Sequence, residues 1–265
     1  MRLTAILLAS VALTASAAAA DLYTAAPAAL PVYEEPSNWT GFYAGIFGGV
    51  AFNPADPGTI EIDQDLDGNF DEPLVAPLLG AFGSNFFGSR DAGVTLGLEA
   101  GYDYQIDNFV VGGIIDLAYV DYRDVQSARS STPANYDQIS EVEWLGTIRA
   151  RAGYLVTPDV LAYVHGGLAV GGTDFSFSSS NPNGVSRGGE ETSVGFQIGA
   201  GVEAKVTSNI SLGLEYAYTN LGDTDFTTRF NNAPFRAVNP AGSDLRGSDR
   251  SLDFHTVKAS LKYRF

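Results

Sequence analysis

Apolar and polar residues alternate with a period of two over eight segments of the chain. The clearest is residues 194–206, with Val194, Phe196 and Ile198 on one face and Gly195, Gln197 and Gly199 on the other. The other segments are residues 39–52, 94–104, 109–120, 141–154, 160–170, 210–219 and 254–265. Each is about the length that a tilted strand needs to cross a bilayer. The pattern predicts an all-β fold, an eight-stranded antiparallel up-and-down transmembrane β-barrel, with lipid on one face of each strand and the lumen on the other.

The connections between these segments alternate in length. Residues 106–108, 157–159 and 207–209 are short turns rich in Asp, Asn and Pro, whereas residues 53–93, 121–140, 173–191 and 220–251 predict long loops. Short turns on one side and long loops on the other are typical of outer-membrane barrels. Several aromatic residues near the strand ends predict an interface girdle on the turn side: Trp39, Tyr102, Tyr104, Phe109, Tyr154, Tyr263 and Phe265.

A soluble lipocalin-like barrel or a β-sandwich is the alternative, with the apolar faces turned inward. Glycine favours the membrane barrel, because it lies mainly on the polar faces, where a narrow lumen leaves room for few large side chains.

The N-terminal residues predict export from the cytoplasm. Arg2, an apolar stretch and three alanines at 18–20 form a secretory signal peptide, residues 1–20. Residues 21–37 contain three prolines and predict an extended periplasmic tether, which leaves residues 38–265 for the barrel. The chain has no cysteine, which excludes thiolate chemistry, and its net charge of −16 argues against a nucleic-acid partner.

Four motifs resemble small OmpA/opacity-type outer-membrane barrels of alphaproteobacteria. They are Trp-Thr-Gly-Phe-Tyr-Ala-Gly at 39–45, Trp-Leu-Gly-Thr-Ile-Arg-Ala-Arg-Ala-Gly-Tyr at 144–154, Gly-Gly-Leu-Ala at 166–169 and the terminal Tyr-Arg-Phe. The resemblance implies a porin-family or immunogenic outer-membrane protein of a Gram-negative bacterium. It also implies that the barrel-assembly machinery reads Tyr263 and Phe265. The expected surroundings are outer-membrane lipids and lipopolysaccharide, with both termini in the periplasm.

Charged residues on the polar faces predict a network inside the lumen. Its expected members are Glu99, Asp103, Asp116, Glu141, Glu143, Arg149, Arg151, Glu203, Lys205, Glu215, Lys258, Lys262 and Arg264. An eight-stranded lumen is only wide enough to be filled by side chains, so opposite charges can pair there and block flow. The functional alternative is a narrow ion path between the charges.

An acidic run in the first long connection resembles the start of a calcium loop. Asp63, Asp65 and Asp67 occupy its positions one, three and five, and Gly68 follows at position six. Asn69 would offer its carbonyl oxygen and Asp71 its carboxylate. Leu74, however, stands where a bidentate Glu is expected. Because the first six positions match, Ca²⁺ is the one candidate cofactor. The alternatives are a solvated acidic loop and bridging of divalent cations to lipopolysaccharide.

Catalysis is not expected, because His165 and His255 are the only histidines and neither has a well-spaced serine partner. The sequence therefore predicts a structural, surface-exposed barrel that supports outer-membrane integrity, with its loops facing the environment. The alternatives are a small porin for ions or small solutes and a loop-mediated adhesin or calcium-binding surface protein. The sequence assigns no host or surface ligand.

Overall fold

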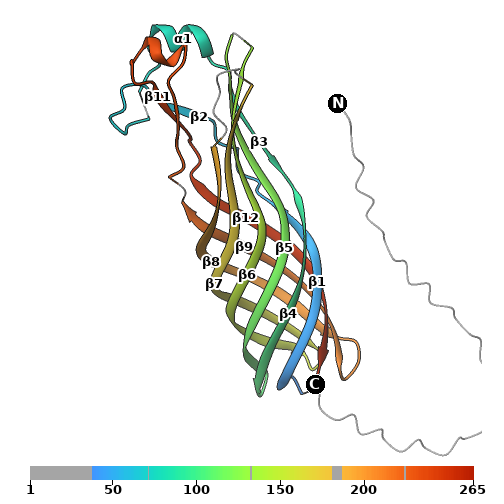
Figure 1. Cartoon of the computed structure of the whole chain (residues 1–265). Coiled ribbons are helices and arrows are strands. Elements are labelled where there is room, and N and C mark those ends of the chain that lie inside the picture. The colour runs from blue at the N-terminus through green and yellow to red at the C-terminus, as the bar shows by residue number, and fades with distance from the viewer. Residues whose placement is uncertain (1–37, 71, 132, 181–186, 224) are drawn as a thin grey trace, which may run out of the picture. The chain divides into compact units, whose positions relative to one another are not determined.

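The computed structural model describes residues 38–70, 72–131, 133–180, 187–223 and 225–265. The expected signal peptide and tether lie outside these residues. Eight long strands form the barrel: β1 (Gly41–Phe52), β4 (Gly93–Ile106), β5 (Phe109–Arg129), β6 (Asn135–Thr157), β7 (Val160–Ser179), β8 (Arg187–Lys205), β9 (Ile210–Asp223) and β12 (Ser251–Arg264). Each pairs antiparallel with its neighbours along the chain, and pairing of β1 with β12 closes the ring (Figure 1). The eight-stranded up-and-down barrel is confirmed.

The outer surface of the barrel is apolar. Every strand contributes one large aliphatic side chain to a belt around the middle, each between 47% and 67% exposed: Ile46, Leu98, Leu117, Ile148, Leu168, Ile198, Leu214 and Leu261. A water-soluble protein does not leave such a continuous belt uncovered, whereas hydrocarbon solvates it. Glycine makes room inside, since a Cβ at Gly201 would lie 2.6 Å from Cζ of the Tyr163 ring.

The two ends of the barrel differ. At one end, hereafter the turn end, short turns join β4 to β5, β6 to β7 and β8 to β9, and the chain terminates at Phe265 (Figure 1). At the other, the loop end, β5, β6 and β7 continue well beyond the barrel. The predicted loops 121–140 and 173–191 are therefore mostly strand, because β5 pairs with β6 as far as Arg129 and Asn135.

A second folded unit lies at the loop end and is built from the two longest connections (Figure 1). Its elements are β2 (Ile60–Asp63), α1 (Ala76–Phe82), β3 (Phe86–Asp91), β10 (Thr228–Phe230), the 3₁₀-helix η1 (Phe235–Ala237) and β11 (Ser243–Gly247). Strand β11 pairs with both β2 and β10, while β3 pairs with the extension of β5. We call this unit the loop-end module.

The loop-end module has an apolar interior of its own. The extended strands β5, β6 and β7 contribute Ala128, Tyr136 and Phe177 to it. The full set of buried side chains is Ile60, Ile62, Leu78, Phe82, Ala128, Ala134, Tyr136, Phe177, Phe230, Phe235 and Leu245. Rings of Phe82, Tyr136, Phe230 and Phe235 contact one another at centroid distances of 5.3–5.7 Å.

Within the described residues, no helix is long and apolar enough to cross a membrane.

Strand β6 reverses its faces where it leaves the barrel. Its pairing with β5 and β7 shifts between Val142 and Trp144, so Trp144 points outward whereas Val142 is 1% exposed. A bulge of this kind breaks the two-residue period. The prediction that Glu143 faces the lumen is therefore wrong.

Candidate functional site: the filled lumen and the loop-end module

Two layers of ion pairs fill the barrel near its turn end. In the lower layer, Arg151 binds Asp103 and donates to Glu203, with 2.9 Å between Nη1 and Oε2. Arg264 donates to the same two carboxylates at 2.9 and 2.7 Å. Lys262 lies 3.1 Å from Glu203 and 3.4 Å from Glu99. These side chains are buried, so each charge depends on its partners.

The upper layer lies further from the turn end, and its Arg149 is two residues from Arg151 on β6. Arg149 binds Asp116 and donates to Glu215, with 2.7 Å between Nη1 and Oε1. Lys258 lies 3.0 Å from Glu215 and 3.6 Å from Asp116, and the Tyr163 hydroxyl donates to Glu215 at 2.9 Å. Together the two layers hold five carboxylates and five cations, so the filled lumen is close to neutral.

Three predicted lumen residues lie elsewhere. Glu141 and Glu143 are on the outer surface beyond the barrel, where the Glu141 carboxylate pairs with Arg123 at 3.2 Å. The prediction for these two residues is wrong, because the β6 irregularity turns them outward. Lys205 lies at the turn-end rim, where it donates to the Asn38 carbonyl oxygen at 2.7 Å and stands over the Trp39 ring.

Trp39 closes the turn end from inside. It is fully buried, with Val110, Leu155, Leu161 and Tyr163 packed in the same cluster. Its indole N–H donates to the Pro158 carbonyl oxygen at 3.0 Å. The prediction of a girdle position is wrong for Trp39, since its side chain enters the lumen. The other six predicted girdle residues are exposed.

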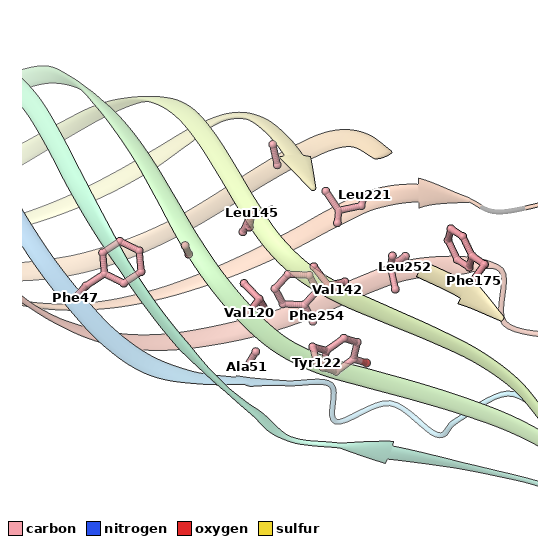
Figure 2. Close-up of a cluster of buried hydrophobic side chains, with 12 residues drawn as sticks. Phe47, Ala51, Val120, Tyr122, Val142, Leu145, Phe175, Leu221, Leu252 and Phe254 are labelled. Atoms are coloured by element: carbon pink, nitrogen blue, oxygen red, sulfur yellow. The ribbon is translucent and has the colours of Figure 1, made fainter. Parts of the chain in front are cut away.

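An apolar plug occupies the lumen on the loop-end side of the ion pairs. Figure 2 shows its side chains directed inward from strands around the barrel, from Phe47 at one end to Phe175 at the other. The members are Phe47, Ala51, Ala118, Val120, Tyr122, Val142, Leu145, Ala169, Phe175, Leu221, Leu252 and Phe254. The ring of Tyr122 stacks on Phe254 at 5.2 Å. No expectation from the sequence included this plug, because several of its members lie beyond the predicted strand ends.

Arg90 ties the loop-end module to the barrel wall. Its guanidinium, on β3, binds the carboxylates of Asp124 on β5 and Asp249 in the last long connection. Gln126 completes the contact by donating to the Asp249 carbonyl oxygen at 2.7 Å. Burial raises the pKa of the Asp124 carboxyl above its usual range, against the opposing effect of Arg90.

The acidic run forms a tight loop on the loop-end module. Carboxylate oxygens of Asp63, Asp65 and Asp67 lie within 4.8 Å of one another. Asp63 is buried and accepts from the backbone N–H groups of Leu66 at 2.7 Å and Gly68 at 2.9 Å. Gly68 has a φ of +92°, a conformation that favours glycine. Asp71 lies outside the described residues, while Asn69 donates its backbone N–H to Asp67.

The two histidines lie on opposite faces of the barrel wall. His165 is inside the lumen, 3.3 Å from the Glu215 carboxylate and within hydrogen-bonding distance of Arg149. His255 is on the outer surface, where its ring stacks on Tyr216 and its Nδ1 lies 2.6 Å from the Tyr216 hydroxyl. Both contacts suit packing and interfacial roles.

Comparison with known proteins gives a consistent family. A family model described as "Outer membrane protein beta-barrel domain" matches residues 5–265. The 31 kDa outer-membrane immunogenic protein of Brucella melitensis is 32% identical over 270 residues, which cover 98% of this chain and 99% of that protein. The 22 kDa outer membrane protein of Rhizobium leguminosarum is 32% identical over 86% of this chain and 79% of its own length.

Among solved structures, the outer membrane protein OprG from Pseudomonas aeruginosa is similar in fold. The TM-score is 0.52 and the match covers 88% of this chain and 100% of OprG, at 16% sequence identity. At that identity the similarity concerns the fold alone.

Proposed function

The chain belongs to the outer membrane protein beta-barrel domain family, and on that premise we propose that it is a non-conducting structural barrel. It is an outer-membrane β-barrel protein of the kind found among immunogenic surface proteins of Gram-negative bacteria. Its proposed role is to support the integrity of the outer membrane and to present the loop-end module to the environment.

This proposal rests on the side chains that fill the lumen. A path along the barrel axis would meet the buried Trp39 cluster, then two layers of paired charges, then the apolar plug. Moving an ion past paired charges requires breaking those pairs in a medium of low dielectric constant. Apart from the Tyr122 hydroxyl, the side chains of the apolar plug then offer no polar group to replace the water around the ion.

Single-channel recording in a planar bilayer tests the proposal. The refolded protein, shown to be folded by heat-modifiable migration on a gel, should give no steady openings. Arg149→Ala and Glu203→Ala should leave the recording silent as well, because the apolar plug stays in place. Arg123→Ala is the matched control, since Arg123 is exposed outside the barrel. Steady openings whose ion selectivity changes with Arg149→Ala or Glu203→Ala, but not with Arg123→Ala, would identify a small porin instead.

The orientation follows from the same proposal. The turn end and both termini would face the periplasm, and the loop-end module would lie outside the cell among lipopolysaccharide molecules. Tyr263 and Phe265 are exposed at the end of β12, where the barrel-assembly machinery could read them. Protease added to whole cells should cleave the long connections and spare the turns. Cleavage at the turns in intact cells would contradict this orientation.

Calcium binding by the acidic loop is a second candidate function. The convergence of the Asp63, Asp65 and Asp67 oxygens within 4.8 Å supports it. Hydrogen exchange at the amides of Leu66 and Gly68 should slow when calcium is added to the wild type but not to an Asp65→Ala, Asp67→Ala variant. No calcium-dependent change below millimolar concentration would exclude this function.

A further inference from the structure

The barrel wall has a seam between β8 and β9 at the loop end, where the β-pairing of these two strands stops. Pairing of these strands stops at Phe196 and Asn220, whereas β8 continues alongside β7 as far as Arg187. On the other side, β9 stays paired with β12 up to Asp223. Within the described residues, the stretch 187–195 of β8 therefore has no partner on the β9 side.

A cavity of about 270 Å³ lies at the seam. Its apolar lining comes from Phe175 on β7, Leu221 on β9 and Leu252 on β12, all members of the apolar plug. Phe226, in the connection after β9, stacks on Phe175 with 6.3 Å between ring centroids. The cavity thus has an apolar, partly aromatic floor on the loop-end side of the plug, and polar residues line the rest of it.

The polar lining of this cavity is acidic. Glu191 and Asp223 are exposed at its rim, and neither takes part in an ion pair among the described residues. Asp225 also lines the cavity and pairs with Arg250. Among the described residues that line the cavity, none is a lysine or an arginine. An anionic rim over an apolar, aromatic floor attracts a cation that carries an apolar body, by charge at the rim and by cation–π and apolar contact beneath it.

We infer that this cavity is a binding site for a small organic cation, an ammonium ion carrying one aromatic or short aliphatic group. The volume is below that of pockets for drug-sized ligands, which fits a phenylalkyl ammonium ion. Its ammonium group sits between Glu191 and Asp223, and its apolar group contacts Phe226, Leu221 and Leu252. A neutral molecule of the same shape keeps the apolar contacts and loses the attraction at the rim.

Saturation-transfer NMR on the barrel in phosphatidylcholine nanodiscs tests the site, with 2-phenylethylammonium as probe and 2-phenylethanol as its neutral isostere. Empty nanodiscs supply the blank. The cation should bind saturably and about tenfold more tightly than the alcohol. Glu191→Gln combined with Asp223→Asn should weaken cation binding about fivefold or more and leave the alcohol unchanged. Phe226→Ala should weaken both ligands.

The control is Asp56→Asn combined with Asp91→Asn, which removes two exposed carboxylates that do not line the cavity. Its net charge equals that of the test variant, so general attraction of cations to an acidic protein changes equally in both. Equal losses in the two variants would overturn the site. So would equal binding of the cation and the alcohol, or no saturable binding of the cation.

Discussion

The barrel exposes large apolar residues on its outer surface and buries charged residues near its turn end, whereas the loop-end module buries apolar residues alone in its core cluster. In the barrel, Leu98 and Ile148 are 65% and 67% exposed while Arg151 is buried. In the loop-end module, Phe82 and Phe235 are fully buried, whereas Asp65 and Asp67 of the acidic run are exposed. One physical rule produces both arrangements, because each side chain follows the solvent around it, hydrocarbon for the barrel and water for the module. Strands β5, β6 and β7 belong to both regions, and the β6 irregularity marks where the rule reverses.

The largest loss of stability is expected for a substitution in the barrel interior. Arg151→Ala leaves Asp103 and Glu203 with fewer partners in a dry lumen and should lower the free energy of unfolding by about 3–5 kcal/mol. Urea unfolding followed by heat-modifiable migration measures it. Arg123→Ala breaks an exposed pair and should cost less than about 1 kcal/mol. Equal costs would mean that the lumen is hydrated.

An arginine substituted on the outer surface of the barrel and one on the loop-end module show which surface faces lipid and which faces water. Ile148→Arg puts a cation in the apolar belt and should cost about 2–4 kcal/mol in a bilayer. Val75→Arg, at a position 46% exposed on the loop-end module, should cost about 0.5 kcal/mol or less. Unfolding in lipid vesicles compares the two variants. A tolerated arginine at 148 would contradict the assignment of that surface to lipid.

Truncation inside the loop-end module should loosen that module without opening the barrel. Leu78 is fully buried, so Leu78→Ala should destabilise the module by about 2–3 kcal/mol. Its neighbour Leu79 is 54% exposed, and Leu79→Ala supplies the control. Limited proteolysis of the long connections should speed up for the first variant only, with heat-modifiable migration unchanged. Loss of the folded barrel would show that the two regions fold as one.

The smallest effect is expected in the acidic loop. Without added metal, Asp65→Ala combined with Asp67→Ala should change the free energy of unfolding by less than about 0.5 kcal/mol, because both side chains are exposed. Calorimetry in the presence of a chelator checks this. A large loss would indicate that the hydrogen bonds that the Asp65 and Asp67 carboxylates accept from the backbone N–H groups of Asp67 and Asn69 hold the loop-end module together.

The barrel was predictable because its strands are periodic and its turns are short. All eight strands and ten of the lumen charges follow from alternation alone, since a regular strand assigns every second residue to one face. Glu141 and Glu143 escaped that rule because one irregularity in β6 reverses it. Trp39 precedes β1, where no alternation specifies a face.

The loop-end module was not predictable in the same way. Its strands β2 and β11 pair Asp63 with Asp244, residues far apart in the chain, and each strand is too short to show a period. Its apolar residues lie among acidic residues, glycines and prolines that read as solvated loop. Tertiary packing, not local pattern, decides such elements.

Reactivity of a single cysteine in the lumen tests the sealed interior most directly. The chain has no cysteine, so Thr147→Cys introduces the sole thiol. Thr147 is 3% exposed between the upper ion-pair layer and the apolar plug, and its hydroxyl makes no hydrogen bond among the described residues, so the substitution should be well tolerated. Ser84→Cys, exposed on the loop-end module, gives the reference rate. In folded protein in vesicles, a water-soluble maleimide should label position 84 and leave position 147 unmodified. Labelling at similar rates would mean a water-filled lumen and would contradict the account.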